Sequence, residues 1–326
     1  MPEAELLATG EGEYRLHDPD TLRAWMRDRK RRDLVDKTTT AADAVGRLVA
    51  DGDYVSFDFS SFTRGPLVLV REVIRQRRRN LWYCAKFTLM ESTLLVAAGA
   101  CSKIDVGFMG LGETLNRAVE RGDVTVSEWT NGTLTLRQQA GAMGVPFLPT
   151  RAMLGSDTIR YSGAKVIRDP FTGKPIALVP ALNPDVGLVH VHQADIYGNA
   201  RCFGPGVQPR ETAMSARKVI VSADEIIEHE EIRKAPGLTT IPYFLVDAVV
   251  HAPFGAYPGG LPGAYEIDFE HFAEYYNLER LGRLDEYLDK YIYSVDSDDD
   301  MLETRVGLRR LKALRRRATI REGYGP

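Results

Sequence analysis

The sequence predicts an α/β protein: a doubly wound, mostly parallel sheet with helices on both faces and a helical C-terminal extension. Short apolar segments of strand length alternate with amphipathic segments of helix length over residues 38–143. Further strand-like segments follow as far as residue 250, and the pattern is helical from residue 264. The expected parts are an N-terminal arm over 1–37, an α/β domain over 38–263 and the extension over 264–326.

Composition narrows the class of protein. The chain has 326 residues and a net charge of -3, which argues against nucleic-acid binding over the whole surface. No apolar run approaches the roughly 20 residues that cross a bilayer, and the acidic first residues lack the features of a signal peptide. Three cysteines at no metal-ligand spacing, Cys84, Cys101 and Cys202, indicate buried, reduced thiols and a cytoplasmic location.

The arm and the first helix come first along the chain. Residues 1–37 are polar and mixed in charge, which predicts a loosely attached segment with a short helix. Residues 38–40 are threonines that supply an N-cap for the first helix of the domain. One face of that helix is apolar, with Ala42, Val45, Leu48 and Val49.

A strand, a loop and a helix follow over residues 53–74. Val55, Phe57 and Phe59 alternate with polar residues, as in a strand, and Pro66 stands where a helix begins. The small residues between them form a loop at a helix N-terminus, where free N–H groups and the helix dipole favour an anionic ligand. An ordinary βα turn explains the same pattern, so both interpretations stay open.

The alternation then continues as a series of βα units. Strands are expected at 81–85, 104–108 and 124–126, and helices at 92–98, 113–121 and 133–143, the last closed by Gly144. Parallel sheets built from such units bind their ligands at the carboxyl ends of the strands.

The alternating pattern of strands and helices ends after Pro146. An irregular stretch is expected as far as Lys174, followed by strands at 176–179, 186–192, 218–221 and 244–250. The extension ends in a strongly basic segment over 305–321, in which leucines recur at helical spacing. We expect an amphipathic helix there, docked on this domain or on a partner, rather than a nucleic-acid reader.

Two carboxylates follow strands of the predicted sheet. Glu128 leaves the 124–126 strand beside Trp129, where it could act as acid, base or nucleophile, or could simply cap the next helix. Glu91 lies in the analogous place after the 81–85 strand, and a helix-capping role is the ordinary interpretation.

Other polar groups lie in the second half of the domain. His190 and His192 face the same way on one strand and Asp195 follows at its end, which could suggest a metal site. No further Cys or His cluster completes it, so no metal is expected. Arg151 with Gly155 and Ser156 would suit a carboxylate or thioester oxygen, or a self-satisfied turn. The dinucleotide, P-loop, zincin and serine-hydrolase motifs are absent from the sequence.

Several segments together resemble the α subunit of family I CoA-transferases, most closely the glutaconate CoA-transferase type. The resemblance extends from Thr38 to about Asn277. The segments that carry it are Gly144–Arg151 with Gly155–Asp157, His190–Asn199, Ala223–Ile227 with Glu230–Arg233, and Ile241–Ala256.

The resemblance implies an α/β fold shared by two subunits, an α₂β₂ assembly, and acyl-CoA and carboxylic acid substrates without a cofactor beyond the CoA thioester. In this family the β subunit has a glutamate, in a Ser-Glu-Asn-Gly-like motif, that attacks the acyl-CoA carbonyl to form an anhydride and then a glutamyl-CoA thioester. The nearest string in this chain, Ser127–Gly132, has two extra residues and lies elsewhere. A partner chain is therefore expected to supply the nucleophile.

The resemblance also implies roles for residues of this chain. The family has a glycine-rich loop after its first strand; here the loop is Phe57–Phe62, with bulkier residues. Ser60, Ser61 and Phe62 are expected to shape the acyl pocket. Arg151, Gly155 and Ser156 would position a carboxylate, and His192 and Asn199 would complete the residues that bind substrate or CoA.

Two alternative functions stay open. Relatives on this scaffold hydrolyse or decarboxylate CoA esters, and in the ring-opening hydrolases an acidic α-chain residue near the Glu128 loop takes part. Glu128 is therefore the expected acid/base if the chain is a hydrolase or lyase subunit. The third possibility is a catalytically silent subunit that binds a ligand or a partner through its basic tail.

Overall fold

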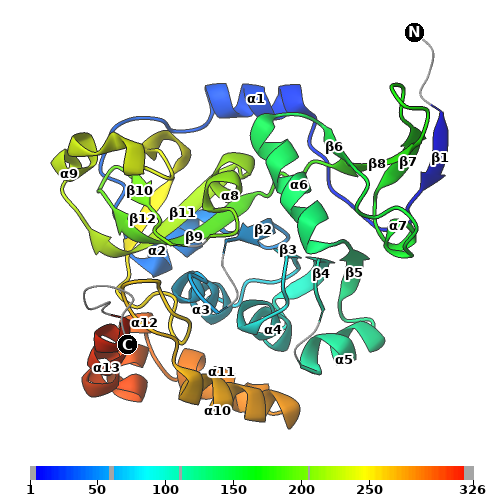
Figure 1. Cartoon of the computed structure of the whole chain (residues 1–326). Coiled ribbons are helices and arrows are strands. Elements are labelled where there is room, and N and C mark those ends of the chain that lie inside the picture. The colour runs from blue at the N-terminus through cyan, green and yellow to red at the C-terminus, as the bar shows by residue number, and fades with distance from the viewer. Residues whose placement is uncertain (1–4, 59–61, 110–111, 205, 319–326) are drawn as a thin grey trace, which may run out of the picture.

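The computed structural model describes residues 5–58, 62–109, 112–204 and 206–318. In this part of the chain the main sheet has eight strands, in the order β12-β11-β9-β2-β3-β4-β5 with β10 beside β9 (Figure 1). Neighbouring strands are parallel, apart from β10, which is antiparallel to β9. The strands are β2 Tyr54–Phe57, β3 Leu81–Ala85, β4 Cys101–Val106, β5 Thr125–Glu128, β9 Val186–Ala194, β10 Ala200–Arg201, β11 Lys218–Ile226 and β12 Ala248–His251.

Helices cover both faces of the main sheet (Figure 1). One face carries α2 Ala41–Leu48, α3 Leu67–Arg75, α4 Met90–Ala97 and α5 Thr114–Glu120, and the other carries α6 Asn131–Met143 and α8 Pro209–Ser215. Thr40 caps α2 as expected, and Gly144 ends α6 in the left-handed conformation. The predicted doubly wound α/β fold is confirmed.

The cover on both faces explains why β2 is buried throughout. Val55 and Phe57 pack into the α2–α5 layer, and Tyr54 packs into the layer on the α6 side. Ser56 is buried as well, and its Oγ accepts a hydrogen bond from Gln138 Nε2 at 2.9 Å. The polar residues that alternate in the sequence therefore face other polar groups, and not solvent.

A second, antiparallel sheet lies at one edge of the molecule (Figure 1). Its strands within the described residues have the order β1-β7-β8-β6. They are β1 Leu6–Thr9, β6 Phe147–Thr150, β7 Lys165–Arg168 and β8 Pro175–Pro180, with the short helix α7 Thr158–Tyr161 between β6 and β7. The sequence-based prediction of an irregular stretch over 146–174 is therefore wrong, and the strand predicted at 176–179 belongs to this sheet.

The N-terminal arm is also attached more firmly than expected. It contains the predicted short helix, α1 Pro19–Asp28, but also β1, which pairs with β7. Arg15 Nη1 donates to Asp185 Oδ2 at 2.7 Å, and Lys30 Nζ donates to Asp247 Oδ2 at 2.7 Å. All four residues of β1 are exposed, so its place rests on backbone hydrogen bonds, which leave no apolar pattern in the sequence.

Short elements complete the α/β domain. Helix α9 spans His229–Lys234, and 3₁₀ turns span Pro236–Leu238 and Tyr243–Leu245. The strand predicted at 244–250 therefore begins later, at Ala248, because a turn occupies its first residues. Among the described helices, none combines the length and the apolar character needed to cross a bilayer.

The C-terminal extension is helical, as predicted. It contains α10 Phe269–Arg280, α11 Leu284–Leu288, α12 Asp298–Met301 and α13 Leu308–Ala318, with π-helical turns at Asp289–Tyr293 and Leu302–Val306. The extension packs against α3 and α4, and α3 is buried along almost its whole length. Arg71 of α3 donates from Nη2 to Asp298 Oδ2 at 2.7 Å and from Nη1 to the carbonyl of Tyr257 at 2.7 Å.

Helix α13 docks on this same chain. Its apolar face is buried through Leu311, Leu314 and Ala318. Arg315 Nη2 lies 3.1 Å from Asp224 Oδ2 at the carboxyl end of β11, and Arg310 pairs with Asp268. The structure therefore shows α13 docked on its own chain, which is one of the two possibilities that the sequence left open.

The Arg71–Asp298 pair yields a prediction about the extension. Asp298→Asn leaves the buried guanidinium of Arg71 without its carboxylate, so we expect the free energy of unfolding to fall by about 3 kcal/mol. Chemical denaturation measures this loss, and limited proteolysis should cut the extension faster. Asp299→Asn is the matched control, because the neighbouring Asp299 is exposed. Equal stability of the two variants would contradict a buried ion pair between extension and domain.

Candidate active site

The main sheet has a point at which the chain changes direction. From β2 the chain runs outward through β3, β4 and β5, and it later returns to place β9 on the other side of β2, followed by β11 and β12. The segments that leave the carboxyl ends of β2 and β9 therefore diverge. In open α/β sheets, ligands bind in the crevice between such segments. Residues at these strand ends are the first candidates for chemistry.

Four buried polar residues from three segments meet at this point; we call them the switch-point cluster. They are Asp58 after β2, Arg64 in the following loop, Lys86 after β3 and Gln208 before α8. Arg64 Nη1 lies 2.9 Å from Asp58 Oδ2. The backbone N–H of Gln208 donates to Asp58 Oδ1 at 2.7 Å, and Gln208 Oε1 accepts from Lys86 Nζ at 2.7 Å. Gln208 thus links the acidic and the basic members of the cluster.

The charges of the cluster depend on one another. Burial raises the pKa of Asp58, and the positive charges of Arg64 and Lys86 oppose that rise. Burial lowers the pKa of Lys86, and the negative charge of Asp58 opposes that fall. Removal from water disfavours each ionised form, so loss of the Asp58 charge would lower the pKa of Lys86 further, and loss of the Lys86 charge would raise that of Asp58.

The loop after β2 is described in part. Ser60 and Ser61, predicted to shape an acyl pocket, lie outside the described residues. Phe62 is half-buried; its ring meets that of Phe272 in α10 edge-on, with centroids 5.0 Å apart. The carbonyl of Phe62 accepts a hydrogen bond from the N–H of Gly260 at 2.9 Å. This end of the loop is therefore held by the C-terminal part of the chain.

Glu128 is the last residue of β5, at the carboxyl edge of the sheet. Its side chain is exposed, and within the described residues it has no hydrogen bond or ion pair. The neighbouring Trp129 is buried, with the Arg137 guanidinium 4.1 Å from its ring centroid. The Trp129 ring thus packs inward against Arg137, whereas Glu128 points to solvent at an outer strand of the sheet.

The turn that contains Arg151, Gly155 and Ser156 joins β6 to α7. All three residues are exposed. The Oγ of Ser156 donates to the carbonyl of Met153 at 2.8 Å, inside the turn. Gly155 has a φ of +81°, which a residue with a side chain rarely adopts. The turn lies beside the second sheet and is not part of the switch-point cluster.

His192 and Asn199 hold loops in place through the polar atoms of their side chains. His192 Nε2 donates to the carbonyl of Pro262 at 2.8 Å, and its Nδ1 accepts from the N–H of Phe203 at 3.1 Å. Asn199 Nδ2 donates to Asp195 Oδ2 at 2.7 Å, and its Oδ1 accepts from the N–H of Tyr243 at 3.1 Å. In this conformation a ligand would have to displace one of these bonds.

The sequence did not point to Lys86, Gln208 or Arg64 as site residues. It also did not predict that Glu91 is buried. A signal existed for Lys86, since it directly follows a strand next to the opening strand of the sheet. Glu91, in the first turn of α4, is buried, and burial raises its pKa to about 7. A Cβ atom on Gly65 would fall 1.9 Å from Glu91 Oε1, so this carboxyl group lies against the loop after β2.

Metal chemistry finds little support in the side chains. The described residues contain no group of three or more His, Cys, Asp or Glu side chains placed to hold a metal ion. His190 is buried, its Nδ1 lies 3.0 Å from Ser222 Oγ, and burial lowers its pKa to about 3. The cysteine thiols are free, and burial raises the pKa of each to about 12, which makes them poor nucleophiles.

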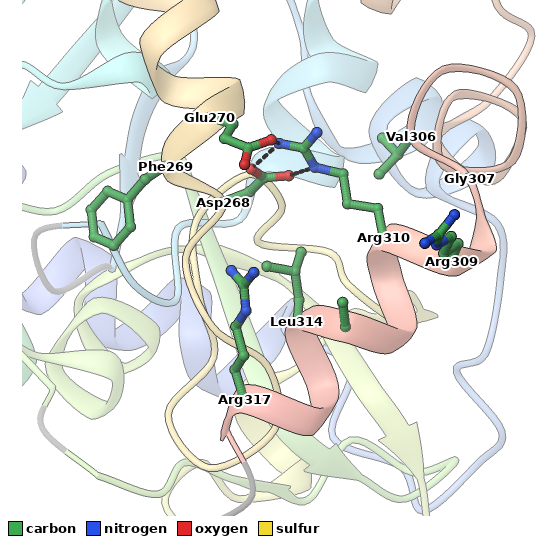
Figure 2. A pocket seen from close by; sticks show the side chains of 10 residues that line it. Asp268, Phe269, Glu270, Val306, Gly307, Arg309, Arg310, Leu314 and Arg317 are labelled. Carbon is green, nitrogen blue, oxygen red and sulfur yellow. Dashed lines mark hydrogen bonds and ion pairs between the residues drawn. The ribbon is translucent and has the colours of Figure 1, made fainter.

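A cavity of about 730 Å³ lies between α13 and the start of α10 (Figure 2). Arg310 pairs there with Asp268 and, at 3.1 Å, with Glu270, while Arg317 reaches along the same wall (Figure 2). The residues that line it belong to segments 268–270 and 306–317. The cavity is therefore a feature of the C-terminal extension and is separate from the switch-point cluster.

This chain is similar to known proteins in sequence. A family model described as Coenzyme A transferase matches residues 38–252. The A subunit of 3-oxoadipate CoA-transferase from Pseudomonas knackmussii is 34% identical over 240 residues, which cover 70% of this chain and 83% of that protein. The cholesterol ring-cleaving hydrolase IpdA subunit of Rhodococcus jostii is 32% identical over 260 residues, 73% of this chain and 86% of that protein.

A further relative has a solved structure. The A subunit of glutaconate CoA-transferase from Acidaminococcus fermentans is 27% identical over 299 residues, 84% of this chain and 93% of that protein. The crystal structure of glutaconate coenzyme A-transferase from the same organism matches with a TM-score of 0.81 and 26% identity, covering 85% of this chain and 95% of that chain. These shares of the chain are larger than residues 38–263 alone, so the similarity extends beyond the α/β domain.

Proposed function

The chain belongs to the coenzyme A transferase family and is of the A-subunit type, and from this premise we propose that it moves CoA between carboxylic acids together with a β subunit. The resemblance expected from the sequence is confirmed. The observation that carries the proposal is the likeness to the A subunits of CoA-transferases over most of their length. We further propose an α₂β₂ assembly in the cytoplasm, which the free thiols support.

The proposed reaction needs no cofactor, because the CoA thioester itself is a substrate. The β subunit's glutamate attacks the acyl-CoA carbonyl, which gives an acyl-glutamyl anhydride and the CoA thiolate. The thiolate then attacks the glutamyl carbonyl, which releases the first acid and leaves a glutamyl-CoA thioester. A second carboxylate reverses these steps and leaves as its CoA ester. The carboxyl edge of the main sheet, with the switch-point cluster, would form this chain's wall of the cleft.

The predicted binding residues remain part of the proposal. Ser60, Ser61 and Phe62 would shape the acyl pocket. The exposed turn of Arg151, Gly155 and Ser156 would meet a carboxylate or the partner chain. His192 and Asn199 would act by holding the neighbouring loops, since their polar atoms are already bonded within the chain. Acids with a second carboxylate are the proposed substrates, by analogy with the glutaconate and 3-oxoadipate enzymes.

The test is a transfer assay with the complex. The chain is purified with a β subunit, and the complex is mixed with acetyl-CoA and isotope-labelled glutaconate. We expect label to appear in an acyl-CoA while the total amount of thioester stays constant, and the chain without its partner to show no turnover. Loss of thioester without labelled acyl-CoA would overturn the transferase proposal.

A hydrolase is the second candidate, favoured by the similarity to the cholesterol ring-cleaving hydrolase subunit. It would use Glu128 as acid/base, whereas the transferase uses a glutamate of the partner. For a transferase, Glu128→Gln should keep the transfer rate within about threefold, because an exposed side chain that makes no transition-state contact changes little. A loss of 100-fold or more, with thioester hydrolysed by the unmodified complex, would favour the hydrolase. Glu120→Gln, another exposed carboxylate, is the matched control.

A further inference from the structure

The positive charge of Lys86 in the switch-point cluster is only partly balanced by its neighbours. Lys86 is 5% exposed, and within the described residues its ammonium group makes one hydrogen bond, to the neutral amide oxygen of Gln208. Asp58 attracts Lys86 electrostatically, but its two oxygens are directed to Arg64 and to the N–H of Gln208. An ammonium group has three donors, so two of them have no partner in the described part of the chain.

The contacts of Lys86 compensate poorly for its burial, which argues against a purely structural role. A buried cation regains its lost hydration energy through an anion and good hydrogen bonds, and a neutral amide provides only part of that. Burial lowers the pKa of Lys86, and the nearby negative charges, that of Asp58 first, do not fully oppose this. Glu211 in the first turn of α8 attracts Lys86 from a distance but makes no hydrogen bond or ion pair with it. Lys86 therefore offers a buried positive charge that no carboxylate of the described residues contacts directly.

From these contacts we infer that Lys86 binds the second carboxylate of the acyl group, the one that stays free in the CoA ester, and so selects dicarboxylic substrates. The inference rests on the proposed function for the presence of an acyl group, and it adds the residue that recognises it. The ammonium would donate a charged hydrogen bond to the carboxylate through a donor that Gln208 Oε1 does not take. Arg64 stays with Asp58, so Lys86 is the cation with donors to offer.

The number of donors at Lys86 favours a carboxylate over the phosphates of CoA. Lys86 directly follows β3, at the carboxyl edge of the sheet, with little of its surface exposed. One ammonium group can pair with a carboxylate, whereas a phosphate or pyrophosphate carries more charge and normally takes several donors from arginines or a helix N-terminus. The phosphates of CoA would therefore bind elsewhere.

Equilibrium binding tests the inference without any turnover. Glutarate and pentanoate have five carbons each but differ by one carboxylate, and calorimetry with the assembled complex compares them. We expect glutarate to bind more tightly than pentanoate, and Lys86→Met to weaken glutarate binding by about 10- to 100-fold, the value of one hydrogen bond to a charged group. Binding of pentanoate should be unchanged. Lys165→Met, on an exposed strand of the second sheet, is the control.

A second variant keeps the test decisive if Lys86→Met does not fold. Gln208→Glu has almost the same shape and places a carboxylate against the ammonium, at the loss of a 3.2 Å bond from Nε2 to the carbonyl of Thr135. This internal anion should compete with the ligand and weaken glutarate binding about tenfold or more, while the complex stays folded. With a merely structural lysine, the new ion pair would leave glutarate binding unchanged.

Kinetics separate this inference from the proposed function. In the transfer assay, Lys86→Met should raise the KM for glutaryl-CoA and leave the KM for pentanoyl-CoA unchanged. If the complex transfers CoA but does not distinguish glutarate from pentanoate, or if Lys86→Met keeps the distinction, the inference is wrong and the transferase proposal stands. If transfer fails but glutarate binds through Lys86, the proposed function is wrong and the anion site stands.

Discussion

Asp105→Ala should lower the free energy of unfolding by about 3–5 kcal/mol, the loss typical of a broken buried ion pair. Asp105 lies on β4, is fully buried, and accepts a hydrogen bond from Arg137 Nη1 at 2.6 Å. It also accepts from Trp82 Nε1 at 3.0 Å and from the hydroxyl of Tyr54. Without this carboxylate, the buried guanidinium and two other donors lose their acceptor at once.

Chemical denaturation at neutral pH measures the effect, provided that unfolding is reversible. Asp123→Ala is the control, because the exposed Asp123–Arg121 pair should contribute at most about 1 kcal/mol. The Arg137 guanidinium also donates to the carbonyl of Pro180, where the chain passes from the second sheet toward β9. A loss below about 1 kcal/mol for Asp105→Ala would mean that water or a rearranged Arg137 replaces the pair.

Glu91→Gln should stabilise the protein at alkaline pH by up to about 3 kcal/mol. Burial raises the pKa of Glu91 from 4.5 to about 7, and the nearby charge of Arg71 opposes that rise only in part. Each pKa unit corresponds to about 1.4 kcal/mol. The aromatic groups that face this carboxyl group are Tyr83, Tyr275 and Tyr276.

The sign follows from proton linkage. Below about pH 4.5 Glu91 is neutral in both the folded and the unfolded chain, so the substitution should have little effect. Between pH 4.5 and pH 7 the unfolded chain loses this proton first, and the stability of the unmodified protein falls. Above pH 7 the folded protein carries a buried charge that the glutamine variant lacks.

Unfolding free energies at pH 5 and pH 8, for this variant and for Glu120→Gln with its exposed side chain, measure the difference. The gain for Glu91→Gln should appear at pH 8 and be much smaller at pH 5, whereas the control should show no gain at either pH. A glutamine variant that is less stable at pH 8 would indicate that the ionised carboxylate is held by strong hydrogen bonds, and so contradict the raised pKa. Such a result would also show that the loop at Gly65, against which this carboxyl group lies, accommodates the ionised form.

The βα units could be predicted because local signals agree with the tertiary structure. The strand expected at 81–85 is β3 with the same bounds, and Thr40 and Gly144 begin and end helices as their side chains and conformations require. The second sheet could not be predicted in the same way. β1 is exposed at every position and β6 and β7 at about half, so their pairing leaves little apolar periodicity in the sequence.

The features of the candidate site can likewise be separated into those that the sequence predicted and those that only the folded structure decided. The chain by itself determined the family, the alternating α/β pattern and the edge of the sheet where a ligand would bind, because these depend on residues close in sequence and on the order of the elements. Only the tertiary structure brought Gln208 against both Asp58 and Lys86, which are 150 and 122 residues away. It also turned Glu128 outward and buried Glu91, because a side chain's exposure and charge depend on neighbours that only the folded chain supplies.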